Sequence, residues 1–122
     1  MPPIRVLLVD DEPMFLEALG ALLARDDRLE IVASTERGDE ALELAGRMRP
    51  DVALVDLAMP GSDGVETTRR LIRDSPNLKV IVVSGVTDGR ARDDALAAGA
   101  RGFLFKGGLH GEIAEAIVDV MH

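Results

Sequence analysis

Five short apolar runs, each followed by a segment with helical spacing, are the feature of this sequence that most limits its fold. The runs cover residues 5–9, 30–34, 52–55, 79–83 and 102–105. The first, third and fourth are rich in Val, Ile and Leu with little polar alternation. Such runs are typical of strands that are covered on both faces, as in a parallel sheet.

The segments that follow these runs carry apolar residues three or four positions apart, which predicts five helices. Their stripes are Phe15, Leu19, Leu22 and Leu23; Ala41, Leu44, Ala45 and Met48; Val65, Thr68, Leu71 and Ile72; Ala91, Ala95 and Ala98; and Ile113, Ala116, Ile117 and Val120. Pro76 and Gly99 mark the ends of two of these helices. Five βα units in succession predict an α/β fold, a doubly wound parallel sheet with helices on both faces.

Length and charge limit which classes of protein this chain can belong to. The chain has 122 residues, which suits one domain with a single core. Its 14 Lys and Arg against 22 Asp and Glu give a formal net charge of -8, and it has no Trp or Tyr. We therefore expect no direct nucleic-acid binding by this chain. The sequence has no apolar run of about 20 residues, so we expect no membrane span. The lack of cysteine fits a cytoplasmic protein.

Polar residues follow four of the five predicted strands. Asp10 and Asp11 follow the first strand, Asp56 the third, Ser84 the fourth and Lys106 the fifth. The carboxyl ends of parallel strands lie at one edge of the sheet, where ligands bind in folds of this type. The sequence therefore predicts a site at that edge.

The chemistry of these residues points to phosphoryl transfer. Clustered carboxylates need a cation, and hard oxygen ligands suit Mg²⁺. A carboxylate can act as a nucleophile and form an aspartyl-phosphate, while a metal, an ammonium and a hydroxyl offset the charge of the transferring group. Asp56 stands alone on its strand, so we predict it as the acceptor, with Asp10 and Asp11 as a metal platform.

Each residue taken alone has a simpler interpretation. Asp56 could be a turn residue, and Asp11 could cap a helix that begins at Pro13. Ser84 could be a turn hydroxyl and Lys106 a solvated charge. Complementary phosphate chemistry in four turns of one edge favours a shared site over four separate structural roles.

Four segments resemble a known family in their order and spacing: LLVDDE, DVALVDLAMPGSDGVE, VIVVSG and ALAAGARGFLFK. An acidic pair alone is weak evidence, and the D…MPG.DG pattern, with a turn at Pro60 and Gly61, is fairly specific. Together with the Ser and the Lys it is highly specific. The chain resembles a receiver domain of a bacterial two-component response regulator, of the NarL/LuxR type, along nearly its whole length.

The resemblance implies a flavodoxin-like or CheY-like sheet with the strand order 2-1-3-4-5. It implies that Asp56 accepts a phosphoryl group from a sensor histidine kinase. It further implies that Mg²⁺ is held by Asp10, Asp11, Asp56 and the backbone carbonyl of Ala58. Lys106 would pair with the phosphoryl oxygens.

The resemblance also implies a switch. Ser84 would bond to the phosphoryl group and move, and Phe103 would swing inward. The surface that changes would comprise the fourth helix, the fifth strand and the fifth helix, roughly residues 88–121. That surface, or the first and fifth helices, would contact an effector domain or form a homodimer on phosphorylation. We expect no enzyme in the usual sense, only slow self-phosphorylation from small donors and slow loss of the phosphoryl group.

Two positions depart from the family pattern. Gly107 and Gly108 follow Lys106, where relatives often have Pro after a cis bond. A cis bond without proline costs ~3 kcal/mol, so we expect the bond between Lys106 and Gly107 to be trans or mobile. Phe103 stands where many relatives have Tyr, and it cannot donate a hydrogen bond, so the switch is expected to be weaker.

Other interpretations remain open at this point. We expect residues 1–122 to be a single receiver domain, the N-terminal fragment of a longer regulator whose DNA-binding domain is absent; the alternative is a stand-alone receiver. A degenerate receiver that only binds proteins is a rival that Gly107 leaves open. A haloacid-dehalogenase-like phosphatase would place its nucleophile on the first strand as D-x-D, where this chain has Asp10 and Glu12. A flavodoxin-like flavin module is rejected, because carboxylates lie where its phosphate would bind.

Overall fold

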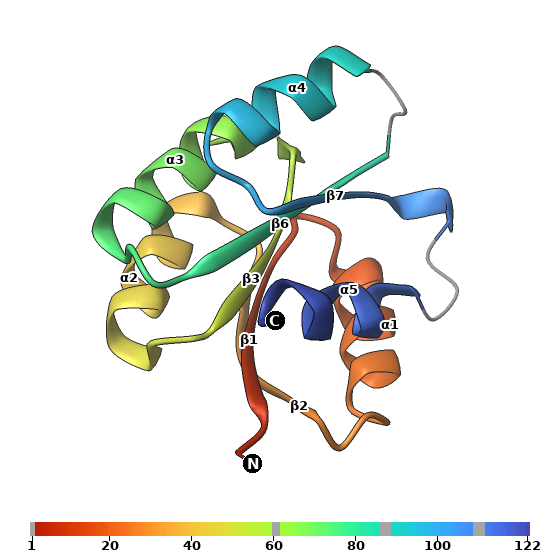
Figure 1. Cartoon of the computed structure of the whole chain (residues 1–122). Coiled ribbons are helices and arrows are strands. Elements are labelled where there is room, and N and C mark those ends of the chain that lie inside the picture. The colour runs from red at the N-terminus through yellow and green to blue at the C-terminus, as the bar shows by residue number, and fades with distance from the viewer. Residues whose placement is uncertain (1, 60–61, 86–88, 109–111) are drawn as a thin grey trace.

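Strands and helices alternate along the chain, and five parallel strands form the main sheet (Figure 1). The computed structural model describes residues 2–59, 62–85, 89–108 and 112–122. The strands of the main sheet are β1 (Ile4–Val9), β2 (Leu29–Thr35), β3 (Val52–Asp56), β6 (Lys79–Ser84) and β7 (Gly102–Phe105). The helices are α1 (Pro13–Leu23), α2 (Gly38–Met48), α3 (Gly64–Asp74), α4 (Gly89–Ala97) and α5 (Glu112–Val120).

The strand order of the main sheet is β2-β1-β3-β6-β7, and all neighbouring pairs are parallel. Counted along the chain, this is the predicted order 2-1-3-4-5, and the five expected helices are present. The predicted runs agree with the observed strands to within one residue at each end. Two short elements were not predicted: a two-residue ladder of β4 (Ala58–Met59) with β5 (Ser62–Asp63), and the 3-10 helix η1 (Lys106–Gly108).

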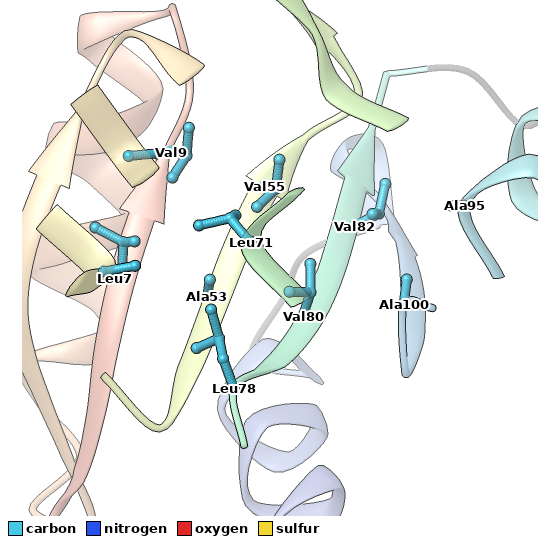
Figure 2. Close-up of a cluster of buried hydrophobic side chains, with 12 residues drawn as sticks. Leu7, Val9, Ala53, Val55, Leu71, Leu78, Val80, Val82, Ala95 and Ala100 are labelled. Carbon is cyan, nitrogen blue, oxygen red and sulfur yellow. The ribbon is translucent and has the colours of Figure 1, made fainter. Parts of the chain in front are cut away.

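Side chains of the central strands alternate between two hydrophobic cores, one on each face of the sheet. On one face, strand residues such as Leu7, Val55 and Val82 pack with α2, α3 and α4, as Figure 2 shows for part of this cluster. On the other face, Val6 and Leu54 pack with α1 and α5. Because both faces are covered, the edge where the strands end is the part of the sheet left for polar side chains.

Local sequence signals explain where the helices begin and end. Pro13 occupies the first position of α1, where its missing N–H costs no hydrogen bond. Asp63 caps α3 by accepting hydrogen bonds from the N–H groups of Val65 and Glu66. Gly99 follows α4 with a φ of 108°, a conformation that favours glycine and stops the helix.

Two residues of the predicted stripe on α4 and just after it are buried. Ala95 packs in the core with α2 and α3, and Ala98 is also buried, while Ala91 is half-buried. Among the described helices, none has the length and apolar character that a membrane crossing requires.

Replacing Leu7 with alanine tests the core between the main sheet and the helices α2, α3 and α4. Leu7 is 0% exposed, and its truncation leaves a cavity between the sheet and its helices, so we expect a loss of about 2–5 kcal/mol in the free energy of unfolding. The control is the same substitution at Leu96 on α4, which is 41% exposed and should cost below about 0.5 kcal/mol. Urea unfolding measures both. Equal losses at the two positions would contradict the assigned core.

Candidate functional site

The predicted site residues gather at the carboxyl edge of the main sheet. Asp10 follows β1, Asp56 ends β3, Ser84 ends β6, and Lys106 begins η1 directly after β7. The side chains of Asp10, Asp56 and Ser84 are buried. They lie at the ends of β1, β3 and β6. The strand order reverses between β1 and β3, and folds of this type bind their ligands near such a point.

Four carboxylates meet at this edge. Asp10, Asp11, Glu12 and Asp56 each place one oxygen within 4.8 Å of the others. Asp10 and Asp56 are buried, Asp11 is half-buried and Glu12 is exposed. Asp10 also accepts a hydrogen bond of 2.9 Å from the backbone N–H of Glu12, which fixes its carboxylate. A set of hard, negatively charged oxygens at this spacing fits Mg²⁺.

Lys106 lies among these acids. Its Nζ is 2.6 Å from Glu12 Oε1, 2.8 Å from Asp10 Oδ2 and 3.5 Å from Asp56 Oδ2. Asp10 Oδ2 is buried and accepts no well-aligned hydrogen bond, so its contact with Lys106 is an ion pair. The Lys106 Nζ also lies 4.5 Å from the centre of the Phe15 ring, a cation–π contact.

These contacts keep Lys106 charged. Burial by itself lowers the pKa of Lys106, but the contacts with Asp10 and Glu12 and the nearby charge of Asp56 outweigh it. The net result is a pKa well above the usual range of a lysine. The ammonium therefore stays charged near neutral pH beside the predicted acceptor.

Gly64 explains part of the MPGSDG motif. A Cβ at this position would lie 2.4 Å from the carbonyl oxygen of Leu57 and 2.6 Å from that of Asp56. The Gly64 N–H donates to the same Leu57 carbonyl, and the Leu57 N–H donates to Val83. Glycine thus lets α3 begin directly against the backbone that carries Asp56. Pro60 and Gly61 lie outside the described residues.

The structure also gives the positions of two other predicted residues, Ala58 and Phe103. Ala58 lies two residues after Asp56 in β4, paired with Asp63, and the role of its carbonyl as a metal ligand stays a prediction. Phe103 is half-buried in β7 and packs against the core that the sheet forms with α2, α3 and α4. Asp88, the first residue of the predicted switch surface, lies outside the described residues.

The bond between Lys106 and Gly107 is trans, because the described part of the chain has no cis peptide. This agrees with the sequence expectation. A Cβ on Gly107 would lie 2.5 Å from the Phe105 ring. A residue larger than glycine would therefore clash with this ring unless the ring moved.

Sequence reasoning missed two contacts of Lys106. It assigned Glu12 no contact with Lys106 and identified Phe15 only as part of a helix stripe. Lys106 is 94 residues from Glu12 in sequence, and no local pattern joins them. The available signal was that Lys106 is the basic residue predicted at this acidic edge, which indicated a contact with the acids there but did not identify Glu12.

Comparison with known proteins decides the family. Residues 6–118 match the family model described as Response regulator receiver domain. The chain belongs to the response regulator receiver family. Domains of this family act in signalling rather than as enzymes in the usual sense, and they bind Mg²⁺ at an acidic pocket such as the one described above.

Curated relatives share this receiver domain but are longer. The chain is 39% identical over 114 residues to the response regulator GacA of Pseudomonas viridiflava, which covers 93% of this chain and 53% of that protein. It is 38% identical over 114 residues to the transcriptional regulatory protein LiaR of Bacillus subtilis (strain 168), with 93% and 54% covered. The receiver chain thus spans about half the length of the curated relatives it matches.

Solved structures agree with this receiver fold. The signal receiver domain of a NarL response regulator from Mycobacterium tuberculosis superposes with a TM-score of 0.91 at 33% identity, over 98% of this chain and 97% of that one. A LuxR-family response regulator from Aurantimonas sp. SI85-9A1 gives a TM-score of 0.93 at 28% identity, over 98% and 85%. The prediction of a NarL/LuxR-type receiver is confirmed.

Replacing Gly64 with alanine tests whether this glycine supports the backbone at Asp56, the predicted acceptor. The new Cβ must push the backbone at Asp56 and Leu57 aside, so we expect a loss of about 1–3 kcal/mol in stability together with slower phosphorylation of the folded fraction. Gly46 on α2 is the matched control, because nothing lies within 4 Å of a Cβ there. Its change to alanine should leave phosphorylation unchanged and stabilise the helix by up to about 1 kcal/mol. Similar effects at the two glycines would contradict the role of Gly64.

Proposed function

We propose that this receiver domain takes a phosphoryl group from a sensor histidine kinase onto Asp56. The observation that supports this best is a buried carboxylate at the end of a central strand, 3.5 Å from a lysine ammonium and close to three further acids. In the reaction an oxygen of Asp56 attacks the phosphorus, and the bond from phosphorus to the kinase histidine breaks. The electron pair of that bond stays on the imidazole nitrogen, and an acyl phosphate forms on Asp56.

Two side chains would serve the phosphoryl oxygens. The Lys106 ammonium would offset their charge, since it stays charged near neutral pH and lies near the Asp56 carboxylate. Ser84 would donate a hydrogen bond from its hydroxyl. Asp56 pairs with Val83 across the sheet, so Ser84 is the next residue along the neighbouring strand, which supports its assignment.

Asp10, Asp11, Asp56 and the backbone carbonyl of Ala58 would hold Mg²⁺ at this site. When bound, the ion would neutralise part of the charge on the phosphoryl oxygens and on the clustered acids. Glu12 belongs to the same acidic cluster, but its carboxylate is the closest partner of Lys106, and we leave it out of the metal ligands.

Phosphorylation would act as a switch through charge. It adds a strongly negative group with several acceptor oxygens, so Ser84 and Lys106 would be drawn toward Asp56 and the population would shift between two states. Phe103, half-buried in β7, would turn inward. The affected surface would be α4, β7 and α5, which would contact an effector or mediate dimerisation; α1 and α5 are the alternative surface for this contact.

The longer relatives suggest the output. LiaR is a transcriptional regulatory protein, and this chain matches about half of its length. We therefore propose that the domain is the N-terminal part of a cytoplasmic regulator whose effector acts on transcription. The phosphatase alternative is not favoured, because the family match covers residues 6–118. The intact acids at the carboxyl edge favour a phosphorylated receiver over a degenerate one.

Phosphorylation with a small donor tests Asp56. Incubation with acetyl phosphate and Mg²⁺ should add the mass of one phosphoryl group, stable in acid and lost in base, as measured by mass spectrometry. Asp56→Asn should show no adduct, and removal of Mg²⁺ with a chelator should abolish the adduct in the wild type. Asp27→Asn makes the same change at an exposed position and should behave like the wild type. An adduct on Asp56→Asn, or one formed equally well without Mg²⁺, would contradict the proposal.

A further inference from the structure

Lys106 has its shortest contact with a residue that the phosphoryl chemistry does not use. Its Nζ lies 2.6 Å from Glu12 Oε1, against 3.5 Å from Asp56 Oδ2. The side chain of Lys106 is 14% exposed, while that of Glu12 is 62% exposed. Glu12 therefore reaches in from the surface to hold an ammonium that is mostly covered.

Capping of α1 does not account for this contact. It occupies the N-cap position of α1, but its side chain makes no capping hydrogen bond. Phe15, one turn further along α1, places its ring 4.5 Å from the same ammonium. Two residues at the start of α1 thus contact the Lys106 ammonium beside the predicted acceptor.

The contact with Glu12 is suited to being exchanged. An ion pair with a solvent-exposed partner is weak, because water screens it and competes for both groups. A phosphoryl group on Asp56 carries more negative charge than the Glu12 carboxylate and offers several acceptor oxygens. We therefore expect the Lys106 ammonium to exchange its contact with Glu12 for one with the phosphoryl group when Asp56 is phosphorylated.

We propose that Glu12 is a positioning residue that holds Lys106 in the unphosphorylated domain and competes with the phosphoryl group for it. This inference rests on the proposed function, in which Lys106 pairs with the phosphoryl oxygens on Asp56. Loss of the Glu12 charge removes the shortest contact of Lys106 and leaves those with Asp10 and Asp56, which lie on the acceptor side, and so favours the activated state.

The first test reads Lys106 directly, without any phosphoryl group. Lys106 and Lys79 are the only lysines, so mass spectrometry after brief acetylation compares the two side chains within one sample. We expect Glu12→Gln to raise the labelling of Lys106 relative to Lys79 by about two- to fivefold. Glu17→Gln removes the same charge from an exposed position of α1 and should leave the ratio unchanged.

The second test measures the competition. Binding of beryllofluoride, a mimic of the phosphoryl group, should be about two- to fivefold tighter in Glu12→Gln and unchanged in Glu17→Gln. Glu12→Asp keeps the charge on a shorter side chain and should fall between the wild type and Glu12→Gln. In a Lys106→Met background, the effect of Glu12→Gln should vanish, because Glu12 acts through Lys106.

Several outcomes would overturn the inference. They are an unchanged Lys106 labelling ratio in Glu12→Gln, weaker beryllofluoride binding in that variant, or an effect that persists in the Lys106→Met background. Weaker Mg²⁺ binding with unchanged labelling would assign Glu12 to the metal instead. Where the Lys106→Met background binds too weakly to measure, the labelling ratio alone decides.

Failure here is distinguishable from failure of the proposed function. The labelling is done without Mg²⁺ or a phosphoryl donor, so its result stands whether or not Asp56 is phosphorylated. A wild-type domain that takes up no phosphoryl group would overturn the proposed function instead. Because Glu12 is exposed and caps nothing, its substitution should not disturb folding.

Discussion

The contact between the Lys106 ammonium and the acids at the carboxyl edge of the sheet is the interaction on which the site depends. Asp10 and Asp56 are 2% and 3% exposed, and ionised groups buried to this degree are costly unless they are paired. Lys106 supplies that pairing from the far end of the sequence. Lys106 follows β7, which pairs with β6, so this pairing depends on contacts between segments that lie far apart in the chain.

The same arrangement fits the proposed switch. Lys106 contacts three carboxylates at once. A new negative charge on one of them would strengthen the attraction of the ammonium to that residue relative to the other two. Ser84 ends β6 and Lys106 directly follows β7. These two strands are neighbours in the sheet and precede α4 and α5 in the chain. The proposed movement of Ser84 and Lys106 would therefore act at the ends of the two strands that precede these helices.

Much of this structure could be predicted from local patterns. The burial of β1, β3 and β6 on both faces is visible as uninterrupted runs of Val, Ile and Leu, since successive side chains point to opposite cores. The start of α1 is visible in Pro13 and the end of α4 in Gly99, because each residue has its own backbone preference. The β4 and β5 ladder escaped prediction, since two residues per strand are too few to show a period.

The sequence by itself determined the order of the elements and which polar residues would stand at the strand ends. It placed Asp10, Asp56, Ser84 and Lys106 at one edge, because parallel strands with helical crossovers align their carboxyl ends. Only the tertiary structure decided how those groups pair. That Glu12 and Phe15 hold Lys106, and that Gly64 lies against the backbone of Asp56, depends on distances between segments far apart in the chain. Such distances follow from packing in three dimensions, for which a one-dimensional pattern carries no signal.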